Sequence, residues 1–403
     1  MSRKPFVNLK RPVPVKRPVS FLQSPWRGAA CLAVLCLAAL PWWGCASANL
    51  DQGAMDQSRL AKLLRLRGID PHSVLLPYGL TEEMRRWVLD TVPKRHSPEE
   101  RLDRLRNALL DERDLAVRYT WGYTGTAAEV FQYREANCLA FTNLFLGMAR
   151  ELGIPVYFMA VENVETFRKH GDLVVISDHI AVGYGEGPSR RIYDFSESPE
   201  DDLRFVHKIS DLRAIAMFHS NRGAEALQNG AVATALGWLE LAVEIDEELP
   251  SAWVNLGVAQ RRAGENRLAE ASYKKAIEVD AGVYSAYHNL AALLRTSDRT
   301  AEAVAYEETL ARSPNRNPFT YLTLGDLSLQ AGRLDEAERY YRRAVNLSQA
   351  DAECFAALGQ WALVKGDIRL ARRMLRKAQR EEGGGSRVDG LVLALQSKES
   401  SSG

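Results

Sequence analysis

Apolar positions between residues 138 and 153 recur at the spacing of one helix face. They are Leu139, Phe141, Leu144, Phe145, Met148 and Leu152. Asn137 is a good N-cap before this run, and Gly153 followed by Pro155 ends it. The pattern therefore predicts a helix whose first turn contains Cys138. Unpaired N–H groups and the positive end of the helix dipole favour a thiolate there, typically by about 0.3–1 kcal/mol.

Similar patterns predict secondary structure on both sides of this helix. Upstream, helices are predicted over 56–68, 81–92 and 98–114, the last opened by the capping box Ser97-Pro98-Glu99-Glu100. Downstream, strands are predicted over 156–161, 178–184 and 191–195, and a turn at 185–188 joins the last two as a hairpin. A helical layer followed by an antiparallel sheet predicts an α+β domain.

The C-terminal half repeats with a period of 34 residues. A large residue opens each unit, at His219, Trp253, Tyr287, Tyr321 and Phe355. Three positions later stand Arg222, Leu256, Leu290, Leu324 and Leu358, each followed by a small residue, at Gly223, Gly257, Ala291, Gly325 and Gly359. Small residues at these positions allow two antiparallel helices to approach closely. Five units in phase predict an all-α array in which Cys354 lies in an apolar environment.

This pattern resembles tetratricopeptide repeats. Gly264, Gly332 and Gly366 mark the turns between helices of units two, four and five. Unit one departs from the family with Arg222 where Leu is expected, and unit three departs with Glu307 at an aromatic position. The resemblance implies a superhelix whose concave groove holds a protein or peptide partner. A spacer or oligomerisation scaffold is the alternative.

The N-terminus has the order of an export signal. Basic residues fill the start, an apolar run covers about 28–44, and Gly44 precedes Cys45. This resembles a bacterial lipoprotein signal, which implies lipidation of Cys45 and a place in the cell envelope facing the periplasm, with the outer membrane favoured. Ordinary cleavage after Ala46-Ser47-Ala48 and an uncleaved N-terminal anchor are the alternatives, and all three place the rest of the chain outside the cytoplasm.

Composition excludes some classes of partner. The net charge is +1, and the sequence has neither a glycine-rich phosphate loop nor a basic aromatic patch, so we expect no nucleotide and no nucleic acid. We expect no cofactor and no metal, because the sequence lacks the close ligand pairs of a structural zinc site. A zinc site built from Cys138, His179 and Asp194 is the alternative.

His179 and Asp194 lie in the two hairpin strands, separated by 15 residues. The hairpin can bring both onto one sheet face at the edge nearest the predicted helix start. A thiol, an imidazole and a carboxylate form a nucleophilic relay when they meet. His170 is a competing base, but it lies in a polar segment that predicts a solvated loop.

The order Cys, His, Asp, with Cys at a helix start and the others on successive strands, resembles the transglutaminase-like superfamily. Ala136-Asn137-Cys138-Leu139-Ala140 and the run 149–156 carry the resemblance. It implies Cys138 as nucleophile, His179 as general base and Asp194 as orienting acid, in a peptidase, amidase or acyltransferase. A non-catalytic assembly protein that uses the same fold as a platform is the alternative.

The expected architecture is therefore an α+β transglutaminase-like (papain-like) domain followed by an all-α tetratricopeptide-repeat superhelix. The expected segments are a signal at 1–44, a linker with a short helix at 45–69, the transglutaminase-like domain at 70–212, five repeats at 213–381 and a flexible tail at 382–403. A short capping helix around the apolar run 391–395 is the alternative for part of this tail.

Overall fold

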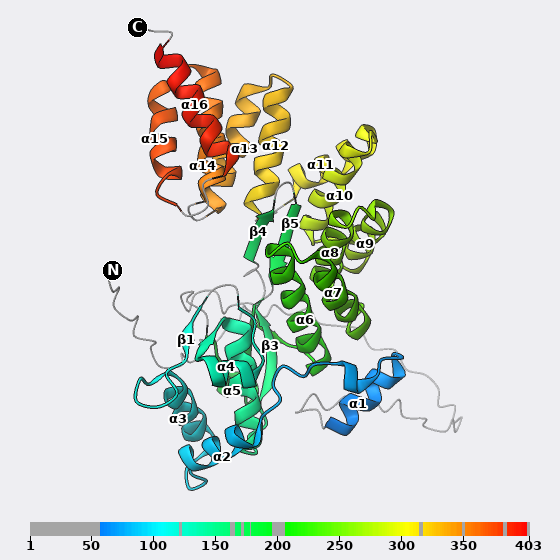
Figure 1. Ribbon diagram of the computed structural model, residues 1–403, viewed down its shortest axis with the longest axis vertical. Helices are drawn as coiled ribbons and strands as arrows, with labels where there is room; N and C mark the ends of the chain where they lie inside the picture. The colour runs from blue at the N-terminus through cyan, green and yellow to red at the C-terminus, as the bar shows by residue number, and fades with distance from the viewer. Residues whose placement is uncertain are drawn as a thin grey trace, which may run out of the picture.

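The computed structural model describes the folded body of the chain with short gaps. The described residues are 57–120, 123–161, 166–170, 173–177, 179–195, 206–313, 317–348, 351–381 and 385–400. The predicted signal segment and Cys45 lie outside them. Within the described residues, no helix is both long and apolar enough to cross a membrane. Figure 1 shows the α+β region at one end, the last repeats at the other, and the first repeats between them.

Three of the predicted helices precede the site. They are α1 (Gln57–Leu66), α2 (Glu82–Thr91) and α3 (Pro98–Leu110). Ser97 is the N-cap of α3 as expected, because its hydroxyl accepts a hydrogen bond from the Glu100 N–H at 3.2 Å. The helix ends before the expected Asp114, since Asp111 caps it and pairs with Arg113 in the following turn at 2.7 Å.

A long buried helix, α5 (Cys138–Glu151), forms the centre of the α+β region. Every residue from Leu139 to Ala149 on it is buried, because other elements cover it on several sides. It contacts α2, α3, the short helix α4 (Ala127–Tyr133) and the strand β6 (Ile180–Tyr184). Two short parallel strands, β1 (Arg118–Tyr119) and β2 (Glu135–Ala136), lead into it.

The main sheet has the order β7-β6-β3-β8, and all its pairs are antiparallel. Its strands are β3 (Tyr157–Val161), β6 (Ile180–Tyr184), β7 (Arg191–Tyr193) and β8 (Val206–Lys208). The first three match predicted strands with shorter bounds, and β8 is a three-residue strand that the sequence did not predict. The antiparallel sheet beside helices confirms the α+β class.

A second hairpin corrects the prediction of a polar loop around His170. Strands β4 (Thr166–His170) and β5 (Leu173–Ser177) pair with each other in an antiparallel register. They form a separate sheet that leaves the α+β region, and β5 contacts the repeat helices α6, α8 and α10. The segment around His170 thus forms a two-stranded ribbon although its first strand is polar, because the repeat helices contact its second strand.

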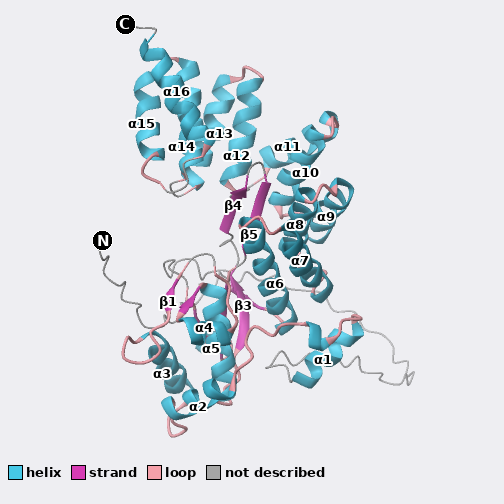
Figure 2. Cartoon of the chain, in the orientation of Figure 1, coloured by secondary structure: helices cyan, strands magenta, loops and turns pink. Residues whose placement is uncertain are grey.

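The repeat array consists of helices only, as Figure 2 shows by colour. The helix pairs are α6 (Asp211–Gln228) with α7 (Val232–Ile245), α8 (Pro250–Arg262) with α9 (Asn266–Val279), α10 (Tyr284–Thr296) with α11 (Thr300–Arg312), α12 (Pro318–Gln330) with α13 (Leu334–Leu347), and α14 (Ala352–Lys365) with α15 (Ile368–Ala378). A further helix, α16 (Ser386–Ser400), packs on α14 and α15. This corrects the prediction of a flexible tail, since Val388, Leu391 and Leu395 are buried and cap the array.

Small residues bring the two helices of a repeat together, as the sequence predicts. A Cβ atom on Gly257 would lie 2.5 Å from the Tyr273 ring, and one on Gly325 would lie 2.5 Å from the Tyr341 ring. Unit three has Ala291 in place of glycine and Glu307 in place of the tyrosine. Glu307 is buried and pairs with Arg295 at 2.5 Å, so an ion pair replaces the glycine–tyrosine contact.

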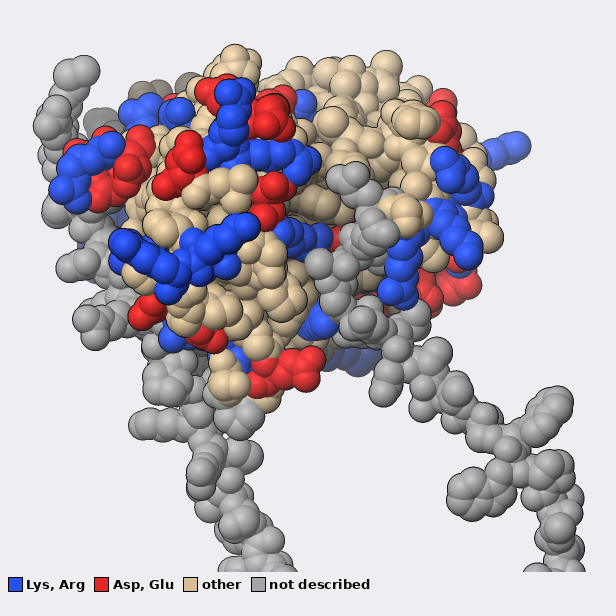
Figure 3. Space-filling model, turned by 90° about the horizontal axis from the view of Figure 1, so that it is seen from below, with Lys and Arg blue, Asp and Glu red and all other residues tan. Residues whose placement is uncertain are grey.

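The hydrophobic core is continuous across the junction between the two regions. One cluster of buried side chains extends from Leu60 to Ala303, and a second extends from Tyr287 to Leu395. The first repeats therefore share a core with the α+β region, and the change of core falls within unit three. On the surface seen in Figure 3, basic and acidic side chains lie interspersed, which agrees with a net charge of +1.

Candidate active site

Cys138 is the first residue of α5, as the sequence predicts. Asn137 caps the helix in an extended conformation, and its side-chain oxygen accepts a hydrogen bond from the Ala140 N–H at 2.9 Å. The Cys138 N–H belongs to the first turn, whose N–H groups have no partner within the helix. Cys138 as a residue is half-buried. By contrast, Cys354 is buried, and burial raises the pKa of its thiol far above the ordinary range.

His179 and Asp194 lie side by side, just outside the strands in which the sequence places them. His179 precedes the first residue of β6, and Asp194 follows the last residue of β7. The register pairs Val182 with Tyr193, so Asp194 falls opposite Ala181 and reaches His179 diagonally. His179 Nε2 and Asp194 Oδ1 are 2.9 Å apart. The hairpin thus brings the two together as expected, although by a diagonal contact.

Aromatic packing holds this hairpin against the cysteine helix. Tyr193 and Phe195, on either side of Asp194, pack on α5 with ring centroids 5.0 Å and 4.1 Å from Phe145 and Phe141, respectively. The Thr142 hydroxyl on α5 donates to the Ile180 carbonyl at 3.3 Å. Both strand ends are therefore fixed to the helix that carries Cys138.

The surroundings of His179 favour the imidazolium form. Burial opposes it, since His179 is only 7% exposed, but hydrogen bonds with Asp194 and with Cys138 outweigh burial and raise the pKa of His179 to about 10. Nε2 faces Asp194, so Nδ1 is the ring nitrogen left for the thiol. This arrangement stabilises an imidazolium next to a sulfur, which is the resting state of a thiol nucleophile.

Other histidines have different environments. His219 is completely buried, and its Nε2 lies 3.3 Å from the Leu75 carbonyl oxygen. Burial lowers the pKa of His219 to about 4, so it is a neutral core residue. His170 lies at the end of β4 and not in a loop. Among the described residues, no group of three or more His, Cys, Asp or Glu side chains is placed to hold a metal ion.

The aromatic residues that precede Cys138 in the sequence include Trp121, Tyr123 and Tyr133. Trp121 lies outside the described residues, and Tyr133 is 56% exposed. Tyr123 lies next to Gly125, where a Cβ atom would be 2.9 Å from its ring. Sequence reasoning missed Thr124, which accepts a hydrogen bond from the Asn137 side chain at 2.8 Å.

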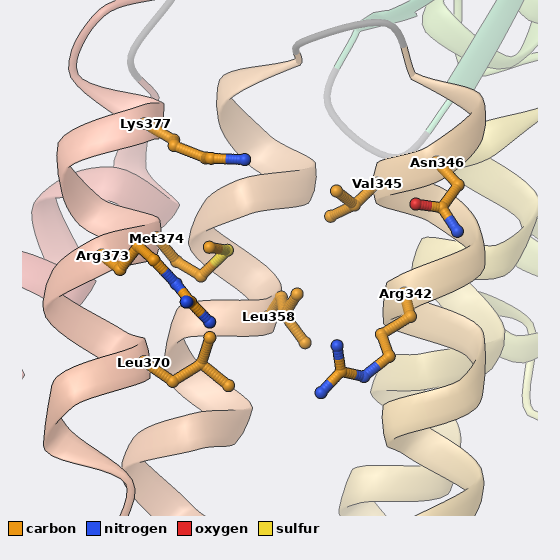
Figure 4. Close-up of a pocket in the computed structure, with 8 residues that line it drawn as sticks. All are labelled: Arg342, Val345, Asn346, Leu358, Leu370, Arg373, Met374 and Lys377. Atoms are coloured by element: carbon orange, nitrogen blue, oxygen red, sulfur yellow. The ribbon is translucent and has the colours of Figure 1, made fainter.

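A cavity of about 300 Å³ lies in the repeat array between α13, α14 and α15. Figure 4 shows Arg342, Arg373 and Lys377 around it, with Leu358, Leu370 and Met374 on its apolar side. Arg342 pairs with Glu338 at 2.8 Å, and the Lys377 ammonium lies 5.2 Å from the centre of the Phe355 ring. The cavity therefore combines positive charge with apolar surface.

Both regions of the chain match models of known protein families. Residues 85–170 match the model of the transglutaminase-like superfamily, and residues 250–282 and 320–351 match the tetratricopeptide repeat. The first match contains Cys138 and ends before His179. A protein of Pseudomonas aeruginosa described as the probable biofilm formation methyltransferase WspC is 37% identical over 82 residues, which is 20% of this chain and 19% of that protein. The chain thus spans about a fifth of that relative's length.

Solved structures similar to the chain include pilF of Pseudomonas aeruginosa, at 21% identity and a TM-score of 0.40 over 47% of this chain and 85% of that one. YrrB, described as a TPR protein with an unusual peptide-binding site, is 19% identical with a TM-score of 0.31, over 46% of this chain and 92% of that one. In the APC/C hetero-tetramer Cut9–Hcn1, the matched chain is 16% identical with a TM-score of 0.39, over 46% of this chain and 37% of that one. The family matches and the helical repeats agree with the sequence: the chain combines a transglutaminase-like domain with a C-terminal array of tetratricopeptide repeats.

Proposed function

We propose that the chain is an envelope-anchored thiol enzyme that acts on amide bonds through Cys138, His179 and Asp194, and that its repeats recruit a protein or peptide partner. The observation that carries the enzymatic part is the contact of His179 with Asp194 at 2.9 Å beside a partly exposed cysteine at a helix start. A buried structural cysteine requires neither an ionisable partner nor access to solvent.

The chemistry follows from these groups. The Cys138 thiolate attacks the carbonyl carbon of an amide, and the carbonyl electrons move to its oxygen. The Cys138 N–H is a donor for that oxyanion. Collapse of the intermediate breaks the C–N bond, and the proton of the His179 imidazolium goes to the departing amine, which leaves a thioester on Cys138. Water or a second amine then attacks the thioester as His179 takes its proton, and the Cys138 thiolate leaves, which regenerates the starting ion pair.

Asp194 holds the imidazole ring in place and stabilises its positive charge. The same triad supports hydrolysis and acyl transfer, because the two differ only in the acceptor. A site that excludes water favours transfer to an amine, and an open site favours hydrolysis.

The enzymatic proposal is tested with dimethylcasein and a fluorescent primary amine. Covalent incorporation of the amine indicates acyl transfer, whereas new N-termini, or ammonia released when the amine is omitted, indicate hydrolysis. Either activity is expected in the wild-type chain and in Cys354→Ser, and is expected to be lost in Cys138→Ser. Turnover that persists in Cys138→Ser would overturn the proposal. If neither activity is seen and Cys138 is alkylated like an ordinary thiol, the chain is a non-catalytic scaffold.

For the partner, we place binding at the cavity between α13, α14 and α15. Its basic side chains and apolar surface favour a peptide with an acidic residue next to a leucine or phenylalanine. The surface formed by the first helices of units one to three is less suitable for a partner, because β5 of the same chain contacts those helices. Anisotropy of a labelled acidic-apolar peptide should show binding that weakens with salt and with Arg373→Glu. Equal binding of Arg373→Glu would contradict this location.

Anchoring through Cys45 is part of the proposal and rests on the resemblance of residues 28–45 to a lipoprotein signal. Metabolic labelling with palmitate in a bacterial host should label the wild-type chain and not Cys45→Ala. Fractionation of inner and outer membranes then tests the expected place at the outer membrane. Equal labelling of both chains would exclude a lipid at Cys45.

A further inference from the structure

The first repeat helix, α6, holds the loop that precedes the cysteine helix. The Thr124 N–H donates to Glu225 Oε1 at 2.6 Å, and the Thr124 carbonyl accepts a hydrogen bond from Arg222 Nη1 at 3.3 Å. Both polar groups of one peptide residue are thus bound by side chains from α6, about 100 residues further along the chain. Thr124 itself is buried.

The third polar group of Thr124 continues the path to the active site. Its hydroxyl accepts a hydrogen bond from Asn137 Nδ2 at 2.8 Å, and Asn137 Oδ1 accepts one from the Ala140 N–H at 2.9 Å. Asn137 is both the N-cap of α5 and the neighbour of Cys138. An unbroken series of hydrogen bonds therefore joins the repeat array to the helical turn that carries the nucleophile.

The sequence of unit one shows that this connection is specific to it. The other four units have leucine where unit one has Arg222, and a leucine can donate no hydrogen bond. The Arg222 guanidinium lies 5.5 Å from the centre of the Trp238 ring, which holds it in place from the second helix of the same unit. His219, at the position where the other units have an aromatic residue, binds the Leu75 carbonyl in the α+β domain. Unit one thus departs from the repeat pattern where it touches that domain.

The Glu225 side chain lies in a partly buried environment, in contact with Thr124 and near Arg222. Its carboxyl is largely buried, and burial raises its pKa, while the bond from the Thr124 N–H acts in the opposite direction. Arg222, one turn earlier on the same helix, places a positive charge near it. The pair therefore presents one donor and one acceptor at the spacing of a single peptide unit.

We propose that Arg222 and Glu225 are positioning residues for Cys138, and that they act through Thr124 and Asn137 to fix the first turn of α5. The repeat array then supports the active site directly, in addition to any partner that it binds. The catalytic meaning of this inference rests on the proposed function, but the positioning itself is independent of turnover.

The experiment measures alkylation of Cys138 by iodoacetamide in the full chain, with mass spectrometry and over a range of pH. Arg222→Leu installs the residue of the other units, and Glu225→Ala removes the acceptor. Each should slow alkylation at neutral pH by about fivefold, the size expected for losing a capping interaction. Arg222→Lys and Glu225→Gln keep a donor and an acceptor, so each should restore part of the rate.

The matched control is Arg262→Leu. The Arg262 guanidinium also donates to a backbone carbonyl, that of Leu227 at 2.6 Å, but this contact joins two repeats and does not involve Thr124. Arg262→Leu should lower the melting temperature without changing the alkylation profile of Cys138. A profile changed equally by all three substitutions would show a general loss of structure and would overturn the inference.

Hydrogen exchange of the peptide that covers residues 137–141 gives a second measurement, which needs no reactive thiol. Faster exchange in Arg222→Leu and Glu225→Ala, with normal exchange in Arg262→Leu, supports positioning even if Cys138 proves to be an ordinary thiol and the proposed function fails. Wild-type alkylation and exchange in both variants would overturn the inference and leave the proposed function standing.

Discussion

The two regions of this molecule use their residues in different ways. In the repeat array, equivalent positions have the same role in several units. For example, Gly257 and Gly325 each pack against a tyrosine ring of the facing helix. In the transglutaminase-like domain a polar residue makes contacts that no equivalent position repeats, as Asp194 contacts His179. A departure from the pattern is therefore informative in the array, because four other units show what the ordinary residue would be.

Two such departures have different physical meanings. In unit three, Ala291 and Glu307 replace a glycine and a tyrosine, and Glu307 pairs with Arg295 inside the same unit. In unit one, His219 and Arg222 bind carbonyl groups outside the array. The change in unit three replaces a packing contact with an ion pair inside that unit. The change in unit one connects the two regions.

The largest effect on stability is expected where the regions meet. Asp211 at the start of α6 pairs with Arg150 of α5 at 2.7 Å, and their side chains are only 6% and 14% exposed. Asp211→Ala leaves the Arg150 charge buried without this partner, which should lower the free energy of unfolding by about 3–5 kcal/mol. Chemical denaturation followed by circular dichroism measures this. The exposed pair of Lys365 with Asp335 is the control, and Asp335→Ala should change stability by less than about 1 kcal/mol.

The next effect concerns the active site alone. His179→Ala should slow alkylation of Cys138 by about 10- to 100-fold at about pH 6, because an ordinary thiol is only about 0.3% ionised there. Rates followed by mass spectrometry check this, with the buried Cys354 as an internal reference. If the rate in His179→Ala equals that of the wild-type chain, the imidazole does not activate the sulfur.

The raised pKa of His179 also predicts the pH dependence of stability. The folded state holds the proton to about pH 10, whereas an unfolded histidine releases it near 6.5. The stabilisation is therefore complete below about pH 6.5 and is lost as the pH rises through about 10. Denaturation midpoints of the wild-type chain should fall over this interval more steeply than those of His179→Gln. Parallel curves for the two proteins would show that His179 titrates normally.

A smaller effect tests packing in the array. Gly257→Ala places a methyl group 2.5 Å from a Tyr273 ring atom and should cost about 1–3 kcal/mol. Gly237 in α7 is exposed, and a Cβ atom there would have no neighbour within 4 Å. Gly237→Ala should therefore stabilise the chain by about 0.5–1 kcal/mol through helix propensity. Thermal melts of both variants check the opposite signs, and a shared sign would refute the packing argument.

Several features were readable from local sequence. The start of α5 at Cys138 was predicted correctly, because Asn137 and the apolar spacing specify an N-terminus within a few residues. The paired helices were predicted because the 34-residue spacing repeats the same local signal. The contact of His179 with Asp194 was predictable as a consequence of one short hairpin, although not its diagonal geometry.

Other features needed contacts between distant residues. The β4–β5 hairpin was predicted as a loop, because its surroundings on α6, α8 and α10 lie far along the chain. Residues Ser386–Ser400 were predicted as a flexible tail, because a single helix with little polarity pattern is stabilised only by the array that it covers. Arg222 could be identified from the sequence as a departure from the repeat pattern, but its contact with Thr124 could not.

The sequence by itself therefore determined the main helices and three strands of the sheet, the period of the repeats and the three side chains of the candidate active site, since these follow from local spacing and from the order of residues along the chain. Only the tertiary structure decided that β5 lies on the repeat helices and that α6 binds Thr124. The reason is physical: a hydrogen bond between residues 124 and 225 depends on how two folded regions meet, and neither segment alone records that geometry.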